Sequence, residues 1–203
     1  MKTKLLLLTL TTICAGALCA AEAPKVGTPA PTFSLPDSQG KTRSLSDFKG
    51  KYVVLEWFNP GCPFVQKHYT SDNMQQLQKQ FTGKDVVWLT IDSSAEGKEG
   101  YLTPEAANKQ VADWKMKPTA VLLDPTGKVG HEYAATNTPH MYVIDPNGKL
   151  IYSGAIDDKP SPNPDDVAGA TNYVKVALTE AMAGKPVTTP TSRAYGCSIK
   201  YAQ

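Results

Sequence analysis

The sequence predicts an α/β protein in which a mixed central β-sheet carries helices on both faces and follows an N-terminal β-hairpin. Apolar runs of strand length alternate with helical patterns through much of the chain, which is typical of parallel strand–helix–strand units. Near the end of this pattern, the turn DPNG at residues 145–148 joins two short apolar runs and predicts an antiparallel hairpin. The 203 residues show no internal repeat and no second apolar core, so we expect one domain.

The strands follow from the apolar pattern. Residues 33–45 alternate on either side of the turn residues DSQG, which predicts the N-terminal hairpin. The run YVVLEWF at residues 52–58 is nearly continuously apolar, as expected of a central strand that is covered on both faces. The other expected strands cover residues 86–91, 119–123, 141–144 and 150–153.

The helices follow from spacing and from start and stop signals. A helix is expected after Cys62, because Pro63 suits the first helical position and apolar residues recur at helical spacing as far as Gly83. The cluster at residues 71–73, SDN, interrupts it. Other helices are expected to begin at Thr103, to span residues 128–134 and to run from Asp165 to Gly184, and the tail at 187–203 is expected to be irregular.

Residues 1–20 have the three-part layout of a secretory signal peptide. Two lysines precede an apolar run, and the small residues Ala20 and Ala21 follow it. An uncleaved anchor is the alternative, although the apolar run is short for a membrane span. We therefore expect an exported protein, periplasmic or secreted, with a domain at residues 24–186 and a C-terminal tail at residues 187–203.

Cleavage of the signal peptide changes the charge balance. The whole chain has 21 Lys and Arg against 19 Asp and Glu, and loss of Lys2 and Lys4 leaves 19 of each. A neutral protein lacks the basic stripe that nucleic acid or an anionic membrane surface requires. We therefore expect no nucleic-acid partner and no membrane association after cleavage.

Cleavage also removes Cys14 and Cys19 and leaves Cys62 and Cys197. Export places these two in a compartment where a disulfide persists. Cys62 follows a buried strand and opens a helix, so backbone N–H groups and the positive helix end face its sulfur and favour the thiolate, the species that attacks disulfides or peroxides. The alternative is that Cys62 is a small buried apolar residue.

Cys197 lies on a tail rich in Ser and Thr, next to Gly196. If this tail folds back, its thiol resolves a sulfenate or mixed disulfide on Cys62. One alternative is a permanent Cys62–Cys197 staple, which in the chain-entropy model stabilises the fold by about 5 kcal/mol. The other alternative is two unpaired thiols.

Three segments carry a family resemblance. The stretch VGTPAPTFSLPDSQGKTRSLSDFKGKYVVLEWFNPGCPF resembles the start of redoxins, the alkyl hydroperoxide reductase/thiol-specific antioxidant branch of the thioredoxin superfamily. VLLDPTGKVGHEYAATNTPHMYVIDPNGKLIYSGAIDD resembles the second half of that domain, and GCSIKY is similar to the tail of a peroxiredoxin-like subgroup. The resemblance covers about residues 24–203 and implies a thioredoxin-like fold.

The sequence departs from two patterns of these relatives. Val65 stands where a C-x-x-C motif has its second cysteine. In the peroxiredoxin motif P-x-x-x-T-x-x-C, Leu55 replaces the proline and Asn59 replaces the threonine. Standard peroxidase chemistry is therefore not implied by these residues.

The resemblance also implies roles for residues around Cys62. Glu56 lies six positions before Cys62, where thioredoxins place a buried acid, and it either relays a proton from the resolving thiol or reaches solvent. Pro139 resembles the cis-proline that faces the active cysteine, and His140 lies near Cys62 or at the surface. Lys67 is taken as a solvated lysine. The implied substrate-binding residues are Pro60, Pro63, Thr138, Pro139 and His140.

Two functions from different classes remain open. The first is an exported thiol-dependent oxidoreductase with Cys62, Cys197 and Glu56 as catalytic residues, a peroxide or disulfide as substrate, and an external thiol as reductant. The second is a non-catalytic thioredoxin-like binding module that is closed by a structural Cys62–Cys197 disulfide. We expect no cofactor and no metal, because the three His and two remaining Cys lack short ligand spacings.

Overall fold

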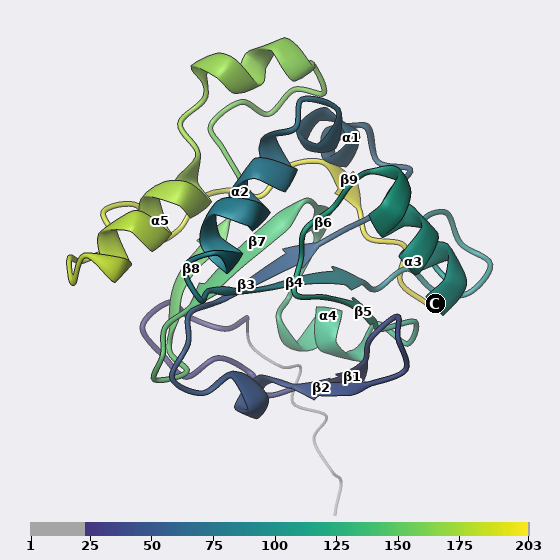
Figure 1. The fold of residues 1–203 in the computed structure, drawn as a ribbon, viewed down its shortest axis with the longest axis horizontal. Coiled ribbons are helices and arrows are strands. Elements are labelled where there is room, and N and C mark those ends of the chain that lie inside the picture. The colour runs from purple at the N-terminus through teal and green to yellow at the C-terminus, as the bar shows by residue number, and fades with distance from the viewer. Residues whose placement is uncertain (1–22, 203) are drawn as a thin grey trace, which may run out of the picture.

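A mixed five-stranded sheet forms the centre of the computed structural model, which describes residues 23–202 (Figure 1). The predicted signal peptide at residues 1–20 lies outside the described residues. No helix within residues 23–202 is long and apolar enough to cross a membrane. The strands of the sheet are β3 (Val53–Trp57), β4 (Val87–Asp92), β5 (Ala120–Leu123), β7 (His140–Ile144) and β8 (Leu150–Gly154).

The order of these strands is β5-β4-β3-β7-β8. β3, β4 and β5 run parallel, whereas β7 is antiparallel to β3 and β8 is antiparallel to β7. All five residues of β3 are buried, as the continuous apolar run predicts for a central strand. The predicted mixed sheet is confirmed.

Helices cover both faces of the sheet. One face packs against α1 (Pro63–Thr70), α2 (Asn73–Thr82), α3 (Pro104–Asp113) and α5 (Tyr173–Met182). The other face packs against α4 (Lys128–Glu132) and the N-terminal hairpin of β1 (Ser34–Pro36) and β2 (Thr42–Ser44), which continues into the 3-10 helix η1 (Leu45–Phe48). Figure 1 shows α4 and this hairpin on the side of the sheet opposite to α1, α2 and α5.

The alternation of side chains along β3 decides which residues share a face with Cys62. Leu55 and Trp57 enter the core beneath α4 and the hairpin. Val54 enters the other core, which also contains Cys62. Glu56, two positions along from Val54, therefore lies on the same face of the sheet as Cys62.

Two helical segments are divided. Asp72 adopts a left-handed conformation (φ 61°) and separates α1 from α2, as residues 71–73 predict. The single helix predicted from Asp165 to Gly184 is wrong. A 3-10 helix, η2 (Pro164–Gly169), ends at the extended Ala170, and α5 begins only after Asn172, whose side chain accepts a hydrogen bond from the Lys175 N–H.

The C-terminal tail, expected to be irregular, contains a strand. β9 (Cys197–Ser198) pairs antiparallel with β6 (Asn137–Thr138), which directly precedes β7. Beyond the strand, the Ile199 N–H donates to the Thr136 carbonyl at 3.1 Å. The sequence pattern could not show this pairing, because two residues give no strand period and the partner lies far away in the chain.

Gly196 allows the tail to approach β6 this closely. Its φ is +114°, and a Cβ atom at this position would lie 2.1 Å from the Thr138 carbonyl oxygen. Every other residue type would therefore push the tail away from β6.

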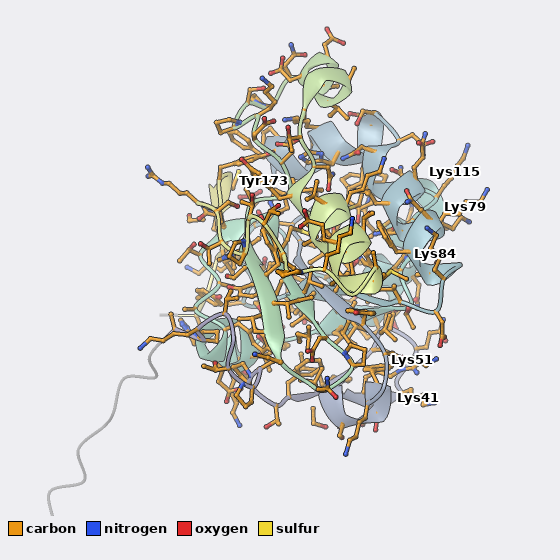
Figure 2. All side chains as sticks on the ribbon, turned by 90° about the vertical axis from the view of Figure 1, so that its left-hand side faces the viewer. Lys41, Lys51, Lys79, Lys84, Lys115 and Tyr173 are labelled. Atoms are coloured by element: carbon orange, nitrogen blue, oxygen red, sulfur yellow. The ribbon has the colours of Figure 1, made fainter. Side chains whose placement is uncertain are left out.

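Charged side chains mark the outer surface of the domain. Figure 2 shows five labelled lysines that project outward from one side of the molecule, and all five are exposed: Lys41, Lys51, Lys79, Lys84 and Lys115. Exposure of these five lysines is what is expected of lysine side chains, which are rarely buried.

We predict that Gly196→Ala destabilises the protein by clearly more than Gly148→Ala does. Gly148 also has a positive φ (+82°) but no atom within 4 Å of an added Cβ, so its variant carries only the backbone cost of about 1 kcal/mol. Urea unfolding compares the two variants, and amide hydrogen exchange at Ile199 reports the tail. Equal losses of stability with unchanged exchange would show that the tail does not depend on Gly196.

Candidate active site

Cys62 lies at the junction between β3 and α1. The Asn59 side chain accepts a hydrogen bond from the Gly61 N–H at 2.7 Å, and the Asn59 carbonyl accepts one from the Cys62 N–H at 3.1 Å. These bonds turn the chain after the strand. Pro63 then occupies the first helical position, so Cys62 is the N-cap residue of α1. The Val65 and Gln66 N–H groups donate to the Cys62 carbonyl at 3.0 and 2.9 Å, so the positive end of α1 lies at Cys62.

The Cys62 thiol is buried against the proline loop. Its side chain is 0% exposed, and Sγ donates to the Thr138 carbonyl oxygen at 3.0 Å. The Thr138–Pro139 peptide bond is cis. Within the described chain, the Thr138 hydroxyl is also buried and has no hydrogen-bond partner. The structure thus brings together three of the predicted site residues: Cys62, Thr138 and Pro139.

β9 brings Cys197 to the same place. In the β6–β9 register, Cys197 is paired with Thr138, whose carbonyl oxygen accepts from Cys62. The Cys197 side chain lies next to that of Cys62, and neither cysteine is in a disulfide. Burial first, and then the hydrogen bond and charge of Cys62, raise the pKa of the Cys197 thiol to about 12. Cys197 is therefore protonated at neutral pH.

Glu56 is fully buried, which excludes the solvent-facing alternative. Burial raises its pKa, although four hydrogen bonds oppose this rise. Its carboxyl oxygens accept from the side chains of Tyr69 (2.7 Å), Trp88 (2.8 Å), Thr90 (3.1 Å) and Gln78 (3.2 Å). None of these bonds joins Glu56 to Cys62 or Cys197, so its role as a proton relay remains a prediction.

The other predicted site residues lie in different surroundings. Pro60 is half-buried, and its carbonyl accepts from the Gln66 side chain at 2.9 Å, whereas Pro63 is exposed beside Cys62. The His140 ring stacks on Tyr142, with ring centroids 4.5 Å apart, on the face of the sheet opposite to Cys62. Burial lowers the pKa of His140 to about 4. The structure therefore does not bring His140 to the thiols.

A buried polar group that the sequence did not predict lies between α1 and the tail. It consists of Lys67 and His68 on α1, Asp157 in the loop after β8, and Tyr195 in the tail. The expectation that Lys67 is solvated is wrong, because its side chain is 0% exposed. These residues come from three segments that are far apart in the chain, so no spacing or motif could have joined them.

The arrangement supplies two thiols in contact beside a cis-proline, at the start of a helix that follows a central strand. Within residues 23–202, no group of three or more His, Cys, Asp and Glu side chains is placed to hold a metal ion. Fold and site together define a redoxin of the thioredoxin superfamily.

Comparison with known proteins gives the family. The AhpC/TSA family model matches residues 26–153, and the chain belongs to this family. It is 28% identical over 127 residues to the thiol-disulfide oxidoreductase ResA of Bacillus thuringiensis, covering 63% of this chain and 68% of ResA. These findings place the chain among redox enzymes of the thiol-disulfide oxidoreductase and redoxin class.

Two further similarities show the range of the relatives. The chain is 40% identical over 72 residues to the peroxiredoxin Bcp of Escherichia coli, covering 34% of this chain and 44% of Bcp. It also resembles the crystal structure of an uncharacterized conserved protein from Geobacillus kaustophilus, with a TM-score of 0.75 and 26% identity. That likeness covers 88% of this chain and 93% of the other.

We predict that Glu56→Gln gains stability relative to the wild type as the pH rises. Folding raises the Glu56 pKa above its ordinary value of 4.5. The contribution of Glu56 to the unfolding free energy of the wild type is therefore complete below pH 4.5 and is lost as the pH rises through the folded-state pKa. The glutamine side chain of the variant does not titrate, so the difference in unfolding free energy shifts by about 1.4 kcal/mol for each pKa unit of the rise. Urea unfolding between pH 4 and pH 8 measures it, and a constant difference would contradict the raised pKa.

Proposed function

We propose that this chain is an exported thiol-disulfide oxidoreductase in which Cys62 is the attacking thiol and Cys197 is the resolving thiol. The observation that carries the proposal is the contact between the two thiols at the Thr138 backbone. The similarity to ResA supports a disulfide as the substrate. The raised pKa of Cys197 supports the order of the two roles, because Cys197 stays protonated while Cys62 attacks.

The proposed reaction exchanges one disulfide for another. The Cys62 thiolate attacks a substrate disulfide, a bond forms between the two sulfurs, and the first substrate thiolate leaves. Cys197 then attacks the Cys62 sulfur, forms the Cys62–Cys197 bond and releases the second substrate thiolate. The protons of the two protein thiols pass to the two released thiols. The substrate disulfide is thereby reduced and the protein oxidised, and an external dithiol restores the protein.

Substrate reaches Cys62 only when the tail moves. The Cys62 side chain is 0% exposed, so no disulfide can approach its sulfur while β9 is paired with β6. The strand pair is two residues long, and the tail beyond it is held by bonds from the Ile199 N–H to the Thr136 carbonyl and from the Ala95 N–H to the Lys200 carbonyl. Opening therefore breaks these few bonds together, which requires less than global unfolding. In this proposal, residues 1–20 are the signal peptide, residues 24–186 form the redoxin domain, and residues 187–203 form the C-terminal tail that carries Cys197.

A peroxide is the second candidate substrate, and the similarity to Bcp favours it. The positions of the two arginines among the described residues argue against peroxide as the substrate, because neither of them lies at Cys62. Arg43 is paired with Asp37 at 2.8 Å in the N-terminal hairpin, and Arg193 belongs to the tail and lines a surface cavity. Neither arginine forms a hydrogen bond or an ion pair with Cys62 in the described residues. We therefore rank peroxide reduction below disulfide exchange.

We predict that reduced Cys197→Ser protein accumulates a mixed disulfide with glutathione at Cys62 when glutathione disulfide is added. The variant lacks the thiol that would release the second glutathione, whereas the wild type proceeds to the Cys62–Cys197 disulfide. Mass spectrometry of the peptides identifies both products. The matched Cys62→Ser variant is expected to react about ten times more slowly.

The outcome separates the candidates. Equal reaction of the Cys62→Ser variant would overturn the assignment of Cys62 as the attacking thiol. Hydrogen peroxide is the parallel probe, and rapid formation of a sulfenate at Cys62 with turnover would make peroxide the substrate instead. No reaction with either probe would favour the non-catalytic binding module.

A further inference from the structure

Lys67, His68, Asp157 and Tyr195 form a buried group, here called the tail anchor. Asp157 is 2% exposed, and its Oδ1 accepts hydrogen bonds from the Tyr195 hydroxyl and, at 3.0 Å, from the Lys159 N–H. Its Oδ2 faces Lys67 Nζ at 3.6 Å and His68 Nε2 at 3.9 Å. These distances exceed a hydrogen bond, so the contact of Asp157 with Lys67 is an ion pair within the fold.

Hydrogen bonds connect the tail anchor to the helices behind it. His68 Nδ1 lies 2.9 Å from the Asn73 side-chain nitrogen, and His68 Nε2 lies 3.2 Å from the Tyr195 oxygen. Burial lowers the pKa of His68 to about 4, so the ring is neutral at pH 7 and carries one proton. Asn73 donates to Nδ1, which leaves the proton on Nε2 to be donated to Tyr195.

Burial of the charged side chains of the tail anchor is unfavourable unless their contacts offset the loss of hydration. Lys67 Nζ donates to the Lys159 carbonyl at 2.7 Å and lies 5.6 Å from the centre of the Tyr195 ring. Burial of an ammonium and a carboxylate is expensive, and an apolar replacement of such a pair is often as stable. Such a pair is therefore weak evidence for stability, and what it supplies here is a connection between α1 and the tail.

The geometry that the anchor fixes is that of the two cysteines. Lys67 and His68 belong to α1, the helix that begins at Cys62, and Tyr195 precedes Cys197 by two residues. The Tyr195 ring also packs against Phe64 on the first turn of α1, with centroids 5.8 Å apart. One end of the anchor is thus fixed to the helix of the attacking thiol, and the other end to the strand of the resolving thiol.

From these contacts we propose that Tyr195 is a positioning residue for the resolving thiol. Its hydroxyl, held by Asp157 and His68, keeps the tail over Cys62 and sets the effective concentration of Cys197 at the Cys62 sulfur. This rests on the proposed function, in which the two thiols form a reversible disulfide. Tyr195 and Asp157 also line a surface cavity of about 600 Å³ with Arg193 and Gly196.

We predict that Tyr195→Phe makes the Cys62–Cys197 disulfide about ten times easier to reduce. The phenyl ring keeps the packing on Phe64 but cannot donate to Asp157, so the reduced tail is freer and closing the disulfide costs more entropy. Thiol labelling in a glutathione redox titration measures the change, and tenfold corresponds to a potential about 30 mV less negative.

The matched control is Tyr52→Phe. Tyr52 donates its hydroxyl to the Ala181 carbonyl at 2.9 Å, at the opposite end of β3 from Cys62. The Tyr52→Phe variant loses a tyrosine hydrogen bond that does not involve the tail. The reduction potential of its Cys62–Cys197 disulfide is therefore expected to equal that of the wild type. A Tyr195→Phe potential that equals the wild type, or an equal shift in Tyr52→Phe, would overturn the positioning role.

A second measurement does not depend on the disulfide. In the Cys197→Ser background, Tyr195→Phe is expected to increase the rate of Cys62 alkylation by iodoacetamide about tenfold, because the released tail uncovers the sulfur. If the wild type forms no Cys62–Cys197 disulfide at any potential, the proposed function fails. The alkylation rate alone then tests whether Tyr195 positions the tail over Cys62. An unchanged rate in that case would overturn it.

Discussion

The backbone of Thr138 is where three distant parts of the chain meet, and the site depends on this meeting. Its carbonyl oxygen accepts from the Cys62 thiol, its strand pairs with Cys197, and its peptide bond to Pro139 is cis. The tail reaches this backbone only because Gly196 has no Cβ atom to collide with the Thr138 oxygen. Two thiols that are remote in sequence are thereby held against each other without a covalent bond.

The face of the sheet that carries Cys62 also contains two buried ionisable side chains, Glu56 and Lys67, whose surroundings differ. Glu56 is surrounded by four donors on its own side of the sheet, so its carboxyl is satisfied locally and fixes the packing of Tyr69 and Trp88. Lys67 is instead balanced by Asp157, which lies in another element and also holds the tail. The first group belongs to the core behind the site, whereas the second connects α1 to the tail that carries Cys197.

The sequence predicted the parts of the structure that local pattern determines. The buried run at β3, the helix start at Pro63 and the Asp-Pro-Asn-Gly hairpin each follow from adjacent residues, and so does the place of Cys62 between strand and helix. The β6–β9 pairing, the burial of Lys67 and the bonds of Tyr195 depend on contacts between remote segments, which leave no periodicity. The helix predicted after Asp165 failed because Asn172 caps a new helix there.

The central claim is that Cys62 and Cys197 are a working redox pair, and the reduction potential of this pair in the wild-type protein tests it most directly. Contact between the thiols under a two-residue strand predicts a disulfide that opens and closes within the range of cellular dithiols, at a potential less negative than about −300 mV. A potential far below that value would identify a permanent structural disulfide and contradict the account.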